Sequence, residues 1–180
     1  MEIETYQTSR LKLRKFTPEV YQQLFSNYSV PEIKEIIGLD SEEAYQKLLK
    51  KHEGGLASYN RSLVSFQLIE QSSNAVIGGC GFHNWFPDHR RAEIGYNLDK
   101  EEFKQQGFMK EAIAFVLNYG FQEMELHRVE ALVSPNNVPS LKLVKHFGFQ
   151  EEGLLKEHYF INDKFEDSLI FGLLQKNFKA

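Results

Sequence analysis

The chain has 180 residues, a formal net charge of −4, 42% hydrophobic residues and 26% charged residues. This length and balance are typical of a single folded domain, spanning residues 1–180, with enough chain for a sizeable core. The acidic charge argues against a nucleic-acid-binding protein, which would carry a basic surface. Cys80 is the only cysteine, which excludes an internal disulfide and argues against a cysteine-based zinc site.

Membrane signals are also missing from the sequence. The N-terminal residues, MEIETYQTSR, lack the apolar core of a signal peptide. No apolar run approaches the ~20 residues that span a bilayer. We therefore expect no membrane partner and a cytoplasmic location.

The first third of the chain predicts one strand and three short helices. Alternating side chains in residues 10–16, RLKLRKF, predict an edge-like strand. Thr17 followed by a proline is typical of a helix start. Two further helices are predicted in residues 31–38 and 40–55, each ended by glycine.

The middle third predicts three antiparallel strands that lead into one long helix. The strands are expected in residues 62–70, 75–86 and 92–98. After a polar loop, apolar side chains recur with helical spacing from Gly107 onward. This apolar stripe comprises Met109, Ala112, Ile113, Val116, Leu117 and Gly120.

The last third predicts a strand, a short helix and two further strands. The strand covers residues 126–133, and the helix that follows ends at Gly148 in a left-handed cap. The final strands are expected in residues 154–161 and 165–174. This order of elements indicates an α+β fold and not a doubly wound α/β fold.

The helix start at Gly107 is a candidate phosphate site. The first N–H groups of a helix lack intrahelical partners and lie at the positive end of its dipole, so they bind anions. Glycine at 107 removes the Cβ that would hold a phosphate away from these amides. Neither the P-loop pattern nor the dinucleotide fingerprint is present.

Residues 104–109, KQQGFM, resemble the pyrophosphate loop of the GCN5-related N-acetyltransferases (GNAT), written Gln/Arg-x-x-Gly-x-Gly/Ala. Lys104 and Met109 depart from the residues usual in that loop. The later run NNVPS resembles the family's Asn-x-x-Ser motif at Asn137 and Ser140. The resemblance covers nearly the whole chain and is strongest toward the ribosomal-protein N-terminal acetyltransferase (RimJ/RimL-like) branch.

This resemblance implies the GNAT fold and its chemistry. The fold is a mixed, mostly antiparallel, twisted sheet of about seven strands flanked by helices, and it is splayed between strands 4 and 5. Acetyl-CoA is then the cosubstrate, and a primary amine attacks the thioester directly in a ternary complex. Separately, no histidine, aspartate or glutamate grouping in the sequence has metal spacing, so we expect no metal.

The resemblance also assigns residues to the cosubstrate. Backbone amides in 105–110 would hold the pyrophosphate, while the pantetheine arm would pair with the splayed strand end. Asn137 has two open roles, because it could bond this arm or cap the next helix. The expected contacts are Asn97, Leu98, Gln105, Gln106, Gly107, Phe108, Met109, Lys110, Asn137 and Ser140.

Catalysis needs a base for the acceptor ammonium and a donor for the leaving thiolate. Glu93 is a candidate base, and a solvated strand residue is an equal alternative for it. Glu157 is a second candidate, on the penultimate strand where relatives carry a carboxylate. Strand alternation would place Glu157 and Tyr159 on one face and His158 on the other.

Ser140 is the candidate acid, since the resemblance places it beside the thioester. Many relatives use a tyrosine a few residues further on, and residues 143–149, LVKHFGF, contain none. His83 and Asn84 could line the acceptor pocket, although a lone strand histidine is more often packed or on the surface.

Three functions follow from the resemblance. The acceptor is a protein N-terminal α-amine of the ribosomal-protein type, or alternatively a small amine such as a polyamine, aminoglycoside or amino-sugar. The third reading is a noncatalytic acyl-CoA-binding module. Pairing through the two C-terminal strands, as in relatives, is compatible with a homodimer.

Overall fold

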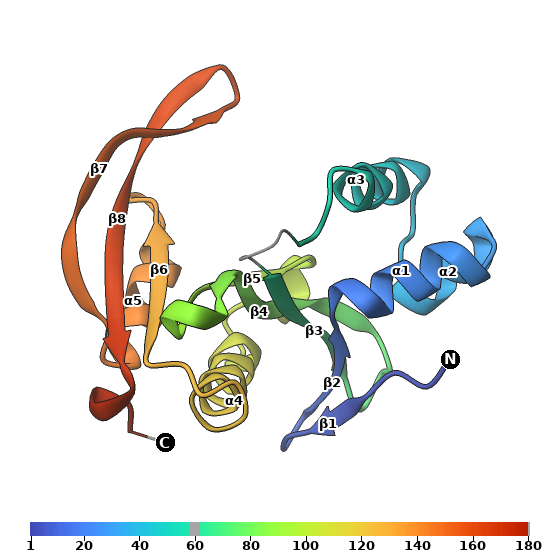
Figure 1. The fold of residues 1–180 in the computed structure, drawn as a ribbon, viewed down its shortest axis with the longest axis horizontal. Helices are drawn as coiled ribbons and strands as arrows, with labels where there is room; N and C mark the ends of the chain where they lie inside the picture. The colour runs from blue at the N-terminus through green and yellow to red at the C-terminus, as the bar shows by residue number, and fades with distance from the viewer. Residues whose placement is uncertain (58–61, 180) are drawn as a thin grey trace.

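The computed structural model describes residues 1–57 and 62–179, and its strands form one mixed sheet (Figure 1). The strand order is β1-β2-β3-β4-β5-β6-β8-β7, and every neighbouring pair is antiparallel except β5 and β6. The strands are β1 (Thr5–Gln7), β2 (Leu11–Phe16), β3 (Ser62–Glu70), β4 (Val76–Phe86), β5 (Arg91–Leu98), β6 (Arg128–Val133), β7 (Gln150–Ile161) and β8 (Lys164–Leu174). The α+β prediction is confirmed, with one strand more than expected.

The helices occupy two regions of the sheet. The first three gather beyond the β2–β3 end, whereas the long helix lies against the middle of the sheet and the last lies beside β6 (Figure 1). They are α1 (Pro18–Asn27), α2 (Val30–Ile37), α3 (Glu42–Glu53), α4 (Phe108–Gln122) and α5 (Val138–His146). Short 3₁₀ turns occur at Pro87–His89, Glu101–Phe103 and Gln175–Asn177. Local caps set these bounds, such as Thr17, whose side chain accepts a hydrogen bond from the amide of Val20.

The predicted edge strand is not at an edge, which corrects the sequence analysis. β2 lies between β1 and β3, with Tyr6 of β1 opposite Leu13 of β2. The ring of Tyr6 packs 5.2 Å from that of Phe115 and 5.7 Å from that of Tyr119, both on α4. The sequence does not reveal β1, because its three residues are too few to show an alternating pattern. The aromatic residues of α4 that Tyr6 contacts are also 109 or more positions away in the sequence.

The core lies between the sheet and α4. Every residue of the predicted apolar stripe on this helix is buried. The helix approaches the sheet closely at Gly120, where a Cβ would come within 2.5 Å of the ring of Phe82. Each large side chain buried here contributes roughly 1.5–3 kcal/mol relative to an exposed one. This packing fixes the start of α4 relative to β5.

The sheet is splayed between β5 and β6, as predicted. These strands pair only at Arg91↔Arg128, Ala92↔Val129 and Glu93↔Glu130. Beyond Glu93, β5 continues to Leu98 without a partner on that side. The added β1 makes these the fifth and sixth strands of the chain. The splay exposes backbone and side chains of β5 at the centre of the molecule.

The β7–β8 hairpin extends beyond the rest of the sheet (Figure 1). Between Leu155 and Tyr159, β7 advances four residues while β8 advances two, and Glu157 adopts φ +49°. The predicted alternation of side chains is therefore wrong in this segment. The carboxylate of Asp167 stabilises the bulge by accepting hydrogen bonds from the amide of Glu157 at 2.9 Å and from Nζ of Lys156 at 2.8 Å.

Large apolar side chains remain exposed on this hairpin. They are Leu154, Leu155, Tyr159, Phe160, Ile161 and Phe165. The expected homodimer through these strands stays a prediction. In residues 1–57 and 62–179, no helix is both long and apolar enough to cross a bilayer.

Candidate active site

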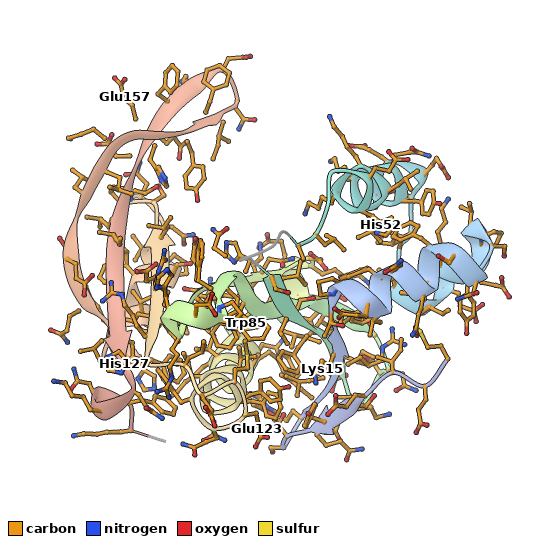
Figure 2. All side chains as sticks on the ribbon, viewed as in Figure 1. Lys15, His52, Trp85, Glu123, His127 and Glu157 are labelled. Atoms are coloured by element: carbon orange, nitrogen blue, oxygen red, sulfur yellow. The ribbon has the colours of Figure 1, made fainter. Side chains whose placement is uncertain are left out.

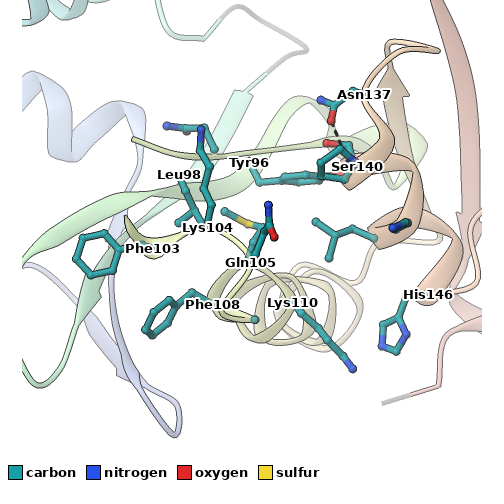
Figure 3. A pocket seen from close by; sticks show the side chains of 16 residues that line it. Tyr96, Leu98, Phe103, Lys104, Gln105, Phe108, Lys110, Asn137, Ser140 and His146 are labelled. Atoms are coloured by element: carbon teal, nitrogen blue, oxygen red, sulfur yellow. Dashed lines mark hydrogen bonds between the residues drawn. The ribbon is translucent and has the colours of Figure 1, made fainter. Parts of the chain in front are cut away.

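A pocket of about 710 Å³ opens between the end of β5, the start of α4 and α5, and it is called the α4–α5 pocket below (Figure 3). Nine of the expected cosubstrate contacts line it: Asn97, Leu98, Gln105, Gly107, Phe108, Met109, Lys110, Asn137 and Ser140. Gln106 is not among the lining residues. Its side chain turns back to donate to the carbonyl of Glu102.

The loop before α4 presents free amides to this pocket. Gln105 and Gly107 both adopt left-handed backbone conformations, with φ of +59° and +83°. The first hydrogen bond of the helix joins the amide of Glu111 to the carbonyl of Gly107 at 3.1 Å. The three amides before Glu111 therefore have no intrahelical acceptor and lie at the positive end of the dipole. This arrangement binds an anionic group.

The charged side chains around the α4–α5 pocket are cationic. Lys104, Lys110 and Lys142 line it. No aspartate or glutamate is among the described residues that line this pocket. A chain of net charge −4 thus concentrates positive potential at one site, which favours a ligand with several negative charges.

An ion pair missed by the sequence analysis braces the loop. The Nε of Arg10 lies 2.8 Å from a carboxylate oxygen of Glu111, and Nη1 of Arg10 donates to the carbonyl of Gln106 at 2.9 Å. Burial opposes the charge on Glu111, but hydrogen bonds from Thr8 and Arg10 outweigh it and lower the pKa of this carboxylate. Arg10 and Glu111 are 101 positions apart, so no local spacing signals the contact.

A smaller pocket of about 250 Å³ lies in the splay itself and is called the junction pocket. It is lined by Glu93 and Tyr96 of β5 and by Asn137 and Ser140 at the start of α5, with His83 of β4. The structure therefore brings the predicted base and the predicted acid to one cavity.

Asn137 performs the capping role foreseen for it. Its Oδ1 accepts a hydrogen bond from the amide of Ser140 at 3.2 Å. Asn137 and Ser140 also line both the junction pocket and the α4–α5 pocket. The cap fixes the start of α5 where these two cavities meet.

Glu93 is nearly buried and is held by two neighbouring side chains of β4. Its carboxylate lies 3.3 Å from Nε2 of His83 and accepts a hydrogen bond from Nδ2 of Asn84 at 2.9 Å. Burial alone would raise the pKa of Glu93. The contacts with His83 and Asn84, together with the charge of His158, outweigh burial and lower this pKa.

Two consecutive residues reach Glu93 because β4 is bulged. The pairing of β4 with β5 shifts between His83 and Phe86, and Asn84 adopts φ +46°. In a regular strand, successive side chains point to opposite faces. The bulge turns both side chains toward Glu93 and excludes the reading of Glu93 as a solvated strand residue.

Glu157 is not part of this arrangement. Its side chain lies far out on the β7–β8 hairpin, away from the body of the sheet (Figure 2). His158 and Tyr159 of the same strand do interact with Glu93. The charge of His158 helps to lower the pKa of Glu93, and the charge of Glu93 adds to the larger effect of burial in raising the pKa of Tyr159. The structure therefore favours Glu93 over Glu157 as the carboxylate of the site.

A third pocket, of about 410 Å³, opens on the other side of β5 and is called the β3–β4 pocket. Its walls are largely apolar and include Phe16, Tyr21, Ile37, Leu39, Leu48, Leu56 and Leu63. The described part of its lining contains one carboxylate, one lysine and one histidine, which are Asp99, Lys51 and His83. His83 lines both this pocket and the junction pocket.

These features fit a known family. Residues 10–150 match the family model described as an acetyltransferase (GNAT) domain. The chain belongs to the GNAT family. The GNAT family uses acetyl-CoA, and this protein is an acyl-CoA-dependent N-acetyltransferase, as the sequence analysis predicted. In the described ranges, 1–57 and 62–179, no three or more histidine, cysteine or carboxylate side chains are grouped to hold a metal.

Relatives of this GNAT protein carry several names. The uncharacterized N-acetyltransferase p20 of Bacillus licheniformis is 34% identical over 181 residues, 98% of this chain and 99% of that protein. The ribosomal-protein-serine acetyltransferase of Escherichia coli is 30% identical over 129 residues, 72% of this chain and 69% of that protein. A solved spermidine N-acetyltransferase SpeG chimera from Vibrio cholerae and hSSAT aligns with a TM-score of 0.62 and 28% identity, covering 76% of this chain and 78% of that one.

Proposed function

We propose that this GNAT protein binds acetyl-CoA in the α4–α5 pocket and transfers the acetyl group to a protein N-terminal α-amine in the β3–β4 pocket. The observation that carries this proposal is that the junction pocket shares residues with both larger pockets. Ser140 lines the junction and α4–α5 pockets, whereas His83 lines the junction and β3–β4 pockets. Two substrates bound on either side of β5 would meet beside Glu93.

The α4–α5 pocket fits the groups of acetyl-CoA. The free amides at the start of α4 suit a pyrophosphate, and the surrounding lysines add charge complementarity. The unpaired edge of β5 from Ile94 to Leu98 offers backbone groups to an amide-bearing arm, as in strand addition. An arm laid along this edge would bring its thioester to the junction pocket.

The junction pocket supplies groups for both proton movements. The acceptor amine must be neutral to attack, and Glu93, whose pKa is lowered in spite of its burial, is ionised at neutral pH. Glu93 would receive the amine proton directly or through His83. Ser140 would donate a hydrogen bond to the sulfur as the thiolate leaves.

The β3–β4 pocket favours a single amine over a polyamine. Asp99 is the carboxylate found in its described lining, and Lys51 offsets that charge. A polyamine carries several ammonium groups with pKa near ~10, and binding them calls for several carboxylates. A protein N-terminus carries one α-amine with pKa near ~8 beside an uncharged backbone. The relative named a ribosomal-protein-serine acetyltransferase supports this acceptor class.

A small-molecule amine is the second candidate. The spermidine N-acetyltransferase chimera is 28% identical to this chain over the aligned region, so the same fold serves that acceptor in a relative. The third reading, a noncatalytic acyl-CoA-binding module, has no support from the named relatives.

A panel of acceptors tests the proposal. Thiol release from acetyl-CoA would be followed with N-terminal peptides of ribosomal proteins, with the same peptides acetylated at the N-terminus, and with spermidine, an aminoglycoside and an amino-sugar. Turnover of the free peptides alone is the expected result. Turnover of a small amine alone would replace this acceptor with the second candidate. If no amine reacts while acetyl-CoA raises the Tm, both proposed acceptor classes are rejected.

A further inference from the structure

The hydroxyl of Tyr96 is a buried polar group that makes no well-formed hydrogen bond with the described residues. Tyr96 lies on β5 after its pairing with β6 has ended. The ring is half-buried against the core, and the hydroxyl oxygen is buried without a hydrogen bond to any described residue. Buried polar groups in folded proteins are nearly always hydrogen-bonded, so this exception calls for an explanation.

The position of Tyr96 explains why its hydroxyl is buried without a hydrogen bond. Tyr96, Asn137 and Ser140 are the residues that line both the junction pocket and the α4–α5 pocket. The ring of Tyr96 runs beneath the start of α5 toward Ser140 (Figure 3). Burial raises the pKa of the phenol, and the nearby side chain of Ser140 partly opposes this effect. The phenol is therefore protonated at neutral pH, and its O–H is available to donate a hydrogen bond.

We propose that Tyr96 is a positioning residue that donates its O–H to Oγ of Ser140 and thereby directs the Ser140 proton at the sulfur of the thioester. A serine hydroxyl rotates freely and carries one donor and two acceptor sites. Occupying one acceptor site from Tyr96 restricts this rotation and polarises the Ser140 O–H. This inference rests on the proposed function, because it concerns the departure of the thiolate in that reaction.

The proton balance needs no further reactant besides water. The C–N bond forms as the C–S bond breaks. The neutral amine nitrogen gives up one proton to Glu93, which later returns it to water, and the sulfur leaves as a thiolate that takes one proton from water. A thiol has a pKa near ~8.5, so the leaving thiolate requires a hydrogen bond more than a strong acid. The chain from Tyr96 through Ser140 to sulfur supplies that bond, while Glu93 receives the proton from nitrogen.

A double-mutant cycle tests the inference, with Tyr96→Phe, Ser140→Ala and the combined variant. Removing the O–H of Tyr96 should lower kcat about 3- to 10-fold while KM for acetyl-CoA stays within about 2-fold. The same change in the Ser140→Ala background should have no further effect on kcat. Equal losses in both backgrounds, or an unchanged kcat in Tyr96→Phe alone, would overturn the inference.

The Tm separates positioning from a structural role. Because a single contact between two hydroxyls contributes little to stability, Tyr96→Phe should leave the Tm nearly unchanged. Tyr45→Phe, at a buried tyrosine on α3, is the matched control and should leave kcat unchanged. A lower Tm in Tyr96→Phe together with an additive loss of kcat would assign the hydroxyl to the fold.

A spectroscopic titration makes the contact visible without turnover. With ¹³Cζ-labelled tyrosine, the resonance that disappears in Tyr96→Phe reports the pKa of Tyr96. Ser140→Ala should shift this pKa, and an unchanged value would overturn the contact. Failure of the proposed function looks different, as a wild-type chain that binds acetyl-CoA and acetylates no amine.

Discussion

His83 and Glu93 face one another across β4 and β5, with Nε2 of His83 3.3 Å from the carboxylate of Glu93. The pair lies where the β3–β4 pocket meets the junction pocket, and the lowered pKa keeps Glu93 ionised at neutral pH. An ionised carboxylate there can hold the acceptor ammonium and receive its proton.

Glu93→Gln should therefore lower kcat/KM by ~100-fold near pH 6 and by less near pH 9. An α-amine with pKa near ~8 is already largely neutral at the higher pH, so it depends less on a base. A pH–rate profile from pH 5.5 to 9.5 measures the difference. Glu130→Gln, at the residue paired with Glu93 on β6, is the control, and a loss independent of pH would reject the base role.

Glu70 provides a prediction for stability in acid. Its carboxylate accepts hydrogen bonds from the hydroxyls and amides of Ser72 and Ser73, which lower its pKa to about 2. A depressed pKa stabilises the fold above the unfolded value near ~4.3, and this contribution is lost as pH falls toward 2.

Glu70→Gln should consequently lower the Tm by a few degrees at pH 7, and the difference from wild type should shrink between pH 4 and pH 2.5. Thermal melts across this range test it. Glu2→Gln, at an exposed residue near the N-terminus, is the control. A difference in Tm that is constant with pH would show that the charge of Glu70 is not responsible.

The parts of the fold that depend on neighbouring residues could be predicted from the sequence. Thr17, Gly38 and Gly107 mark helix ends through backbone conformations and hydrogen bonds within four residues. The splay followed from the family resemblance, which also named Glu93 and Ser140 as separate candidates.

The rest depends on distant contacts or on irregular strands. Arg10 meets Glu111 across 101 positions, which no local pattern reveals. The bulges at Asn84 and Glu157 break alternation, so side-chain directions beyond them could not be deduced from a period of two. The sequence carries no signal for Tyr96, because the missing hydrogen bond of its hydroxyl is visible only in three dimensions.

Two lysines of α5 allow the contribution of pocket charge to acetyl-CoA binding to be tested. Lys142 and Lys145 are both exposed on α5, but only Lys142 lines the pocket. Lys142→Glu should weaken acetyl-CoA binding by about 3- to 10-fold at low salt, and added salt should reduce the difference. Titration calorimetry at two ionic strengths measures it. Lys145→Glu should change the affinity by less than about 2-fold, and equal losses in both variants would point to net charge alone.

Two glycines allow the phosphate loop to be tested apart from backbone strain. Gly107 and Gly148 adopt nearly the same left-handed conformation, with φ of +83° and +81°. A glutamate at either position thus pays a similar conformational cost of ~1–2 kcal/mol. Gly107 lines the α4–α5 pocket, whereas Gly148 does not, and a Cβ at 148 would meet no atom within 4 Å.

Gly107→Glu should abolish acetyl-CoA binding, because its carboxylate would occupy the space in front of the free amides of α4 and repel a pyrophosphate. Gly148→Glu should lower the Tm by a similar amount and retain affinity. The shift in Tm on adding acetyl-CoA reports binding in both variants under the same conditions. An undiminished shift in Gly107→Glu would remove the pyrophosphate from this helix start. A lost shift in both variants would mean that the glycines serve the fold and not the ligand.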